Sequence, residues 1–280
     1  MMTKSEMVAR LDEWITEHYF DEYAPNTLGH YRRAVQKFLD WCEVEEITKE
    51  TMMQYKAHLV EMDCSIISIN TWILILNKYL KWLGYPELRL KKIRTQYEQS
   101  NEDVLSVADF KRLLRFAKRN GDHQLYYIMK ILALTGIRIS ELRYFTVENL
   151  ESNYIKVQNK GKNRKIIVRQ DLMRELKRYA REQHIKSGFL FPSPVIAGKM
   201  VNISTIWRHM KKTAGQAKVR KTKVHPHSFR HLFAQIFLDE YSGNITELAD
   251  ILGHSSLETT RVYTRTNDEQ KRHKLERMNF

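Results

Sequence analysis

The sequence has little cysteine and no long apolar run, and each absence narrows the class of protein. Its two cysteines, Cys42 and Cys64, are not spaced as a CxxC pair, so we expect free thiols of a cytoplasmic protein and no metal site. The most apolar run, 72–76, is too short to span a bilayer. No basic segment followed by an apolar core opens the chain. We therefore expect neither secretion nor membrane insertion.

Acidic residues are scarce in one part of the chain. The net charge is +14 and the pI is near 9.6. Residues 1–100 hold 13 Lys/Arg against 15 Asp/Glu, whereas residues 101–280 hold 34 against 18. A surplus of this size favours a polyanionic partner, and nucleic acid is the commonest. The basic surface is expected in the C-terminal part.

The N-terminal part reads as a helical bundle. A chain of 280 residues exceeds the usual single-domain size, so two domains are expected. Apolar spacing and capping residues predict helices over 5–20, from a cap at Asn26 or Thr27, from Thr48, and over 65–83 before Gly84. These helices make a domain of residues 1–90. We place a linker at 91–102, where apolar periodicity stops.

The C-terminal part, 103–280, mixes helices with a hairpin. Helices are predicted from a cap at Ser106, over 123–134, over 172–184 and over 204–218, and Gly136 allows a tight turn before Arg138. Residues 154–158 and 165–169 alternate like paired strands around a turn rich in cations. The predicted fold class is mainly α with a small β-sheet: an N-terminal helical bundle domain plus an α+β domain.

Chemistry-bearing residues gather between His225 and Tyr263. Pro226 suits the first turn of a helix that carries His227 and Arg230, which lie three apart and hence on one face. A later apolar helix ends at Gly253, a typical C-cap, with His254 just beyond it and Tyr263 nine residues further on.

These motifs, taken in order, resemble those of the tyrosine recombinases, the phage-integrase and Xer-like family. They are Arg138 in Leu-Thr-Gly-Ile-Arg-Ile-Ser-Glu-Leu, His227-Ser-Phe-Arg230-His231, Leu252-Gly253-His254, and Tyr263. The resemblance covers 103–270 by motif and the N-terminal part by size and pattern. It implies a core-binding domain and a catalytic domain that form a C-shaped clamp on DNA.

The resemblance implies a transesterification at a DNA phosphate. Tyr263 would attack the phosphorus, form a 3′-phosphotyrosyl bond and release a 5′-hydroxyl, which later attacks the equivalent bond of a partner strand. No bond energy is lost, so no cofactor is needed. A phenol has a pKa of about 10 and needs a proton acceptor. Arg138 and Arg230 would neutralise the extra charge of the phosphorane.

The same resemblance assigns the other site residues. His227 would be the general base or acid, and His254 would hydrogen-bond the scissile phosphate. The family's hairpin lysine, the general acid for the 5′-oxygen, aligns with Lys160, and Lys162 stays open as the alternative. We expect structural hydrogen bonding of His225 and of the buried His231.

DNA contacts and assembly are expected as well. The candidate DNA-binding residues are Arg32, Arg33, Lys37, Lys78, Lys81, Lys162 and Arg164. The resemblance implies double-stranded DNA recombination sites as partners and a monomer that forms a tetramer in the synapse, with a C-terminal helix docked into the neighbouring subunit. Accessory DNA-bending proteins stay open. So does the choice between integration or excision of a mobile element and resolution of chromosome or plasmid dimers.

Two alternatives compete with this interpretation. A non-catalytic basic DNA-binding architectural or regulatory protein would explain the charge and would not need Tyr263. A hydrolase or nuclease would use His225, His227 and His231 as zinc ligands, but few carboxylates lie nearby in the sequence.

Overall fold

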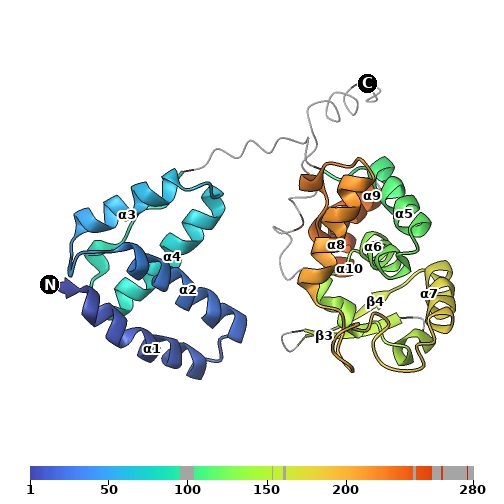
Figure 1. The fold of residues 1–280 in the computed structure, drawn as a ribbon, viewed down its shortest axis with the longest axis horizontal. Helices are drawn as coiled ribbons and strands as arrows, with labels where there is room; N and C mark the ends of the chain where they lie inside the picture. Colours follow the sequence, from blue (N-terminus) through green and yellow to red (C-terminus); the bar gives the residue numbers. More distant parts are fainter. Residues whose placement is uncertain are drawn as a thin grey trace. The chain divides into compact units, whose positions relative to one another are not determined.

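The chain, seen here as a computed structural model, divides into two compact units, Met1–Glu98 and Gln99–Phe280 (Figure 1). The structure describes residues 1–94, 104–152, 154–159, 162–241, 244–253, 260 and 276. Helices dominate both units, and the described strands form two antiparallel pairs. The predicted fold class is confirmed. From residue 95 onward, the predicted linker lies outside the described residues.

The N-terminal unit contains four α-helices in its described part. These are α1 (Lys4–Phe20), α2 (Pro25–Trp41), α3 (Lys49–Glu61) and α4 (Ile66–Leu83), with the short strands β1 (Met2–Thr3) and β2 (Glu46–Ile47) and the 3-10 turn η1 (Pro86–Leu88). Thr48 caps α3 as predicted, and Ser65, predicted as the first residue of α4, caps that helix. The predicted cap of α2 at Asn26 or Thr27 is wrong: the helix begins at Pro25, whose fixed φ suits a first helical turn.

Aromatic side chains form the centre of the N-terminal core. The buried ring of Trp14 stacks on Tyr31 at 5.3 Å between centroids and lies 4.7 Å from Tyr79. The Tyr79 hydroxyl donates to the carbonyl of Met7 at 2.6 Å, which satisfies its buried polar atom. This unit therefore has a hydrophobic core of its own.

The C-terminal unit is built around helix α6. Its described elements are α5 (Val107–Arg119), α6 (His123–Thr135), η3 (Ile139–Tyr144), η4 (Glu148–Glu151), β3 (Tyr154–Asn159), β4 (Lys162–Ile167), α7 (Gln170–Glu182), α8 (Ile203–Gln216), η5 (Lys221–Lys223), α9 (Pro226–Glu240) and α10 (Ile245–Leu252). Helix α6 packs against α5, α8 and α9, which explains why most of its side chains are buried. No helix of the described segments is both long and apolar enough to cross a membrane.

The β3–β4 hairpin is confirmed, but its turn is shorter than predicted. Strand β4 begins at Lys162 rather than 165, and Val157 pairs directly with Arg164. Residues directly opposite each other in an antiparallel pair share one face of the sheet. Val157 and the pair Ile155 and Ile166 are buried. Arg164 therefore lies on the buried face of the hairpin.

Candidate active site

The first turn of α9 presents the histidine motif. Pro226 occupies the start of the helix, and the backbone N–H of Ser228 donates to Nδ1 of His225 at 3.2 Å. The helix predicted from Pro226 and the structural role predicted for His225 are confirmed. The cap leaves His227 in the first turn and Arg230 in the next.

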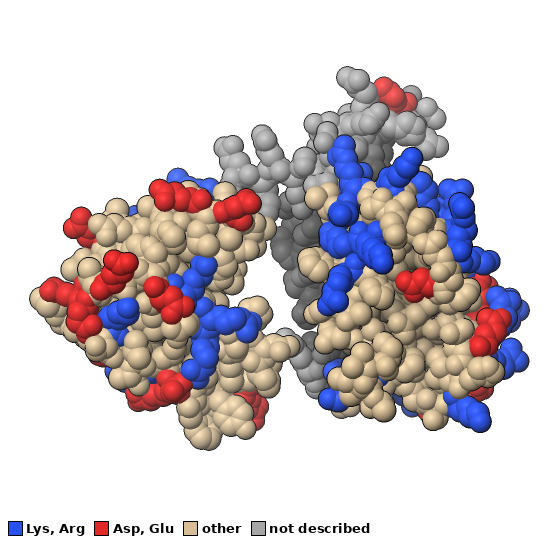
Figure 2. All heavy atoms as spheres, viewed as in Figure 1, with Lys and Arg blue, Asp and Glu red and all other residues tan. Residues whose placement is uncertain are grey.

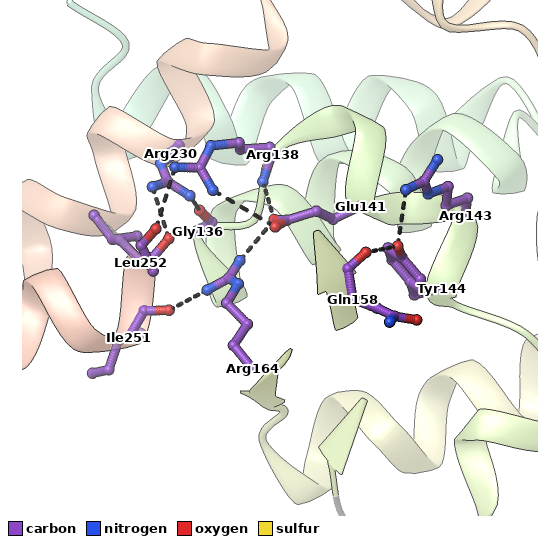
Figure 3. Close-up of polar contacts among 11 residues, drawn as sticks. Gly136, Arg138, Glu141, Arg143, Tyr144, Gln158, Arg164, Arg230, Ile251 and Leu252 are labelled. Carbon is purple, nitrogen blue, oxygen red and sulfur yellow. Dashed lines mark hydrogen bonds and ion pairs between the residues drawn. The ribbon is translucent and has the colours of Figure 1, made fainter. Parts of the chain in front are cut away.

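Arg230 is buried, with 1% of its surface exposed. Its Nη1 donates to the carbonyl of Gly136 at 2.7 Å and its Nη2 to the carbonyl of Leu252 at 2.9 Å (Figure 3). These carbonyls end α6 and α10, where the helix dipole favours a cation. Charge-assisted hydrogen bonds make the burial of a guanidinium tolerable. Arg230 therefore ties the ends of two helices together.

Gly136 makes this junction possible. Its φ of +62° is a left-handed conformation that favours glycine. A Cβ at this position would lie 2.5 Å from Phe233 Cδ1 and 2.7 Å from Leu252 Cδ2. The predicted tight turn before Arg138 is confirmed, and the chain continues into the 3-10 helix η3.

Arg138 is held by its backbone more firmly than by its side chain. Its N–H donates to Glu141 Oε2 at 2.8 Å. Its guanidinium lies 3.4 Å from the carbonyl of Gly253 and 3.7 Å from Glu141 Oε1, and 42% of the side chain is exposed. Arg138 is thus the open arginine of the pair and Arg230 the buried one.

Three arginines converge on three successive carbonyls at the end of α10. Arg164 donates to Ile251 at 2.6 Å, Arg230 to Leu252 at 2.9 Å and Arg138 to Gly253 at 3.4 Å (Figure 3). The next residue in the chain is His254. The two arginines of the sequence motif therefore meet at one helix terminus, although 92 positions separate them in the sequence (138 to 230).

Arg164, predicted to contact DNA, has another position in the structure. Its Nη2 pairs with Glu141 Oε2 at 2.7 Å, and only 18% of its side chain is exposed. The Glu141 side chain is 1% exposed. This ion pair was not predicted from the sequence. The sequence pattern that could have predicted the inward position of Arg164 is the period-two alternation, which puts it on one strand face with Ile166 and Val168.

Desolvation and neighbouring charges favour the neutral forms of His227 and His231 on α9. His227 reaches solvent, yet desolvation of the ring, followed by the charges of Arg230 and other neighbours including Arg138, lowers its pKa. Its ring contacts His231 edge-on at 4.8 Å. Burial lowers the pKa of His231 to about 4. At neutral pH, His227 is therefore in the form that accepts a proton.

Three predicted catalytic residues, Lys160, His254 and Tyr263, lie outside the described residues. Lys162 starts β4, and its side chain is likewise not described. The helix predicted over 267–278 also lies outside the described residues, apart from residue 276. The structure brings Arg138 and Arg230 together at the end of α10, and His227 lies on α9 one turn before Arg230.

The predicted DNA-binding residues of the N-terminal unit lie on α2 and α4. Lys78 and Lys81 line a groove together with Arg89 and Lys91. Arg33 is exposed. Arg32 pairs with Asp12 at 2.6 Å, and the Lys37 ammonium lies 4.8 Å above the ring of Trp72. Two of the three α2 cations therefore already have a partner within the unit.

A basic surface of the C-terminal unit follows α8 and the segment after it. Figure 2 shows Lys and Arg side chains gathered over the region where Figure 1 places α8. Between Ile203 and Val224 the chain has seven Lys or Arg and no Asp or Glu. The predicted concentration of positive charge in the C-terminal part thus forms a surface near the histidine helix α9.

Comparison with known proteins identifies the family. The model of the phage integrase family matches residues 103–270. The chain belongs to this family. The model described as the N-terminal SAM-like domain of phage integrases matches residues 11–89. The predicted tyrosine recombinase family and the enzyme class, a site-specific recombinase, are confirmed, and the non-catalytic alternative is not favoured.

The similar proteins align with nearly the whole of this chain. The tyrosine recombinase XerA of Pyrococcus furiosus is 31% identical, over 96% of this chain and 94% of the relative. The Tn1549 transposon integrase, solved in complex with circular intermediate DNA, has a TM-score of 0.74 at 18% identity and covers 99% of this chain and 100% of its own. A lambda integrase tetramer bound to a Holliday junction has a TM-score of 0.74 at 14% identity, over 95% and 80%. The last two likenesses concern the fold alone.

Proposed function

We propose that this recombinase cleaves and rejoins DNA strands at specific sites through a 3′-phosphotyrosyl intermediate on Tyr263. The observation that carries the proposal is the meeting of Arg138 and Arg230 at the C-terminus of α10, one and two positions before His254. Two fixed positive charges beside a neutral histidine suit a reaction whose transition state gains negative charge on phosphate oxygens.

The steps balance without a cofactor. The Tyr263 oxygen attacks phosphorus while the bond from phosphorus to the 5′-oxygen breaks. The phenolic proton passes to His227, whose lowered pKa keeps it neutral. The 5′-oxygen takes a proton from Lys160 or Lys162. Attack of a partner strand's 5′-hydroxyl on the phosphotyrosine reverses these transfers and restores the tyrosine.

DNA binding and assembly follow the same proposal. Residues 1–90 act as the core-binding domain, 91–102 as the linker and 103–280 as the catalytic domain. Arg32, Arg33, Lys37, Lys78, Lys81 and Lys162 contact phosphates. The partners are double-stranded recombination sites and further copies of the chain, as a tetramer in the synapse. The DNA complex of the Tn1549 integrase and the lambda integrase tetramer support this assembly. We place the activity in the cytoplasm.

Covalent capture tests the proposal and does not require a defined target sequence. The substrate is a pool of duplexes whose arms are an inverted repeat of a randomised half-site, with a nick near the centre. Cleavage beside a nick releases a short fragment, so the protein stays attached to DNA. Wild-type protein is expected to form adducts that resist SDS and enrich one half-site. The released ends should carry a 5′-hydroxyl.

The variant Tyr263→Phe is the matched control because it lacks only the attacking oxygen. It is expected to bind the enriched site and to form no adduct. Chelator should leave the wild-type reaction unchanged, whereas a hydrolase with zinc on the α9 histidines would lose it. Absence of adducts from wild-type protein, or equal adducts from Tyr263→Phe, would contradict the proposal.

A further inference from the structure

Arg164 connects the β-hairpin to the rest of the site. It lies on β4, two positions after Lys162, and its side chain turns to the buried face opposite Val157. One terminal nitrogen donates to the carbonyl of Ile251 at 2.6 Å and the other to Glu141 Oε2 at 2.7 Å (Figure 3). A guanidinium has the fork geometry that such a double contact requires. Three segments therefore meet on a single side chain.

Glu141 transmits this contact to Arg138. Its Oε2 accepts both from Arg164 and from the backbone N–H of Arg138. Its buried Oε1 has no hydrogen bond to the described residues and lies 3.7 Å from Arg138 Nη1. Without Arg164, this carboxylate would be a buried charge without its close counter-ion, a costly arrangement that favours movement. The orientation of Arg138 therefore depends on Arg164 through Glu141.

Gly253 has no side chain, and this leaves room for the side chain of Arg164. A Cβ on Gly253 would lie 2.7 Å from Arg164 Cδ and 3.0 Å from Nε, and the residue has a φ of +64°. The side chain of Arg164 thus lies directly against the last residue before His254. Close packing of this kind fixes the position from which the chain leaves α10.

We infer that Arg164 is a positioning residue of the recombinase. Its side chain holds the β3–β4 hairpin, the segment that carries Arg138 and the C-terminus of α10 in one arrangement. The inference rests on the proposed function. Arg164 acts through Glu141, Ile251 and Gly253 and not on the phosphate. Its loss should therefore slow cleavage of bound DNA and leave DNA affinity unchanged, whereas loss of a phosphate contact would weaken binding.

The experiment compares Arg164→Gln and Arg164→Lys with wild type on an enriched nicked duplex. Adduct formation is timed at saturating DNA, affinity is measured separately, and both are taken at a temperature where each variant is folded. A shift of about 1 Å in catalytic groups costs roughly 10²-fold in rate, so Arg164→Gln should lose about that much. Arg164→Lys keeps the charge but not the fork, so it should fold, bind DNA as wild type does and still cleave more slowly.

Lys165→Gln is the matched control, since it removes the same charge from the neighbouring position. Lys165 is exposed, with its ammonium 4.6 Å above the ring of Tyr154 and away from Glu141. It should cleave at the wild-type rate. If Arg164→Gln does not fold, the double variant with Glu141→Gln removes the unpaired carboxylate. It should recover the fold and keep the slow rate.

Two results would overturn the inference: a wild-type cleavage rate in Arg164→Lys or in the folded Gln variant, or a loss confined to DNA affinity. Failure of the proposed function looks different, because wild-type protein itself would then form no adduct.

Discussion

Arg230 donates a 2.9 Å hydrogen bond to the carbonyl of Leu252, so a buried catalytic candidate is fastened two residues before His254. The same guanidinium holds the carbonyl of Gly136, two residues before Arg138. Arg230 thereby links the segments that carry two other motif residues. In the proposed function it also supplies positive charge to the phosphate.

Replacing Arg230 by lysine keeps the positive charge and removes the planar geometry of the guanidinium. An ammonium cannot reproduce the planar fork that spans Gly136 and Leu252. Loss of a preorganised group that stabilises the transition state typically costs about 10²-fold to 10³-fold in rate. We expect a loss of this size in adduct formation at saturating DNA. Arg169→Lys is the control, since that arginine is 65% exposed and pairs with Asp171. Equal rates for the two variants would refute the linking role.

Gly136→Ala should damage the same junction from the backbone side. The new Cβ meets Phe233 and Leu252 at 2.5 and 2.7 Å in a left-handed conformation. At Gly188, whose φ is +76°, a Cβ meets nothing within 4 Å, so Gly188→Ala carries only the conformational cost. Overpacking adds about 1–3 kcal/mol. Hydrogen exchange of α6 amides should show Gly136→Ala less stable than Gly188→Ala by that amount. Similar protection in both variants would contradict the packing.

The sequence predicted those site residues whose positions are set by their neighbours in the sequence. Arg138, His227 and Arg230 sit in motifs whose local signals, Gly136 and Pro226, are confirmed as a left-handed turn and a helix start. Most helix boundaries followed from caps and periodicity. At α2, Pro25 rather than a polar cap sets the start. Helix α7 has no side-chain cap and lies two residues earlier than the predicted 172–184, and α8 ends two residues before the predicted 218.

The contacts of Arg164 were missed because they are not local. Its partners are Glu141 and Ile251, 23 and 87 positions away. A cation near a hairpin turn was interpreted as a DNA contact, and the turn was predicted too long. Once the strand extends to Lys162, period-two alternation puts Arg164 on the inner face.

Acid should destabilise the C-terminal unit through its histidines. Burial lowers the pKa of His231 to about 4, and the pKa values of His225 and His227 are lowered as well. An unfolded histidine titrates near 6.5. Between about pH 6.5 and 4 the unfolded chain therefore binds more protons, and stability falls as the pH falls.

The variant His231→Gln isolates one of these groups. Its α6 amides should lose less hydrogen-exchange protection than the wild type when the pH falls from 7 to 4.5, after correction for intrinsic exchange. Carboxylates titrate in both proteins and cancel in the comparison. An unchanged pH slope would show that the fold does not favour the neutral form of His231.

Two tyrosines of the N-terminal core should differ in how the loss of the hydroxyl changes stability. Tyr55 Oη is buried and has no hydrogen-bond partner among the described residues, whereas Tyr79 Oη donates to Met7 at 2.6 Å. Tyr79→Phe should cost about 1 kcal/mol, and Tyr55→Phe should be neutral or stabilising. Denaturation followed by tryptophan fluorescence reports this unit, which holds four of the five tryptophans. A larger loss in Tyr55→Phe would contradict the assignment.

Identifying the amino acid that is bonded to DNA tests the phosphotyrosyl mechanism most directly. The adduct on an enriched nicked duplex is digested with nuclease and protease, and the peptide that retains a nucleotide is sequenced by mass spectrometry. We expect a single modified residue, Tyr263, linked to a 3′-phosphate. A nucleotide on any other residue, or linkage through a 5′-phosphate, would contradict this mechanism.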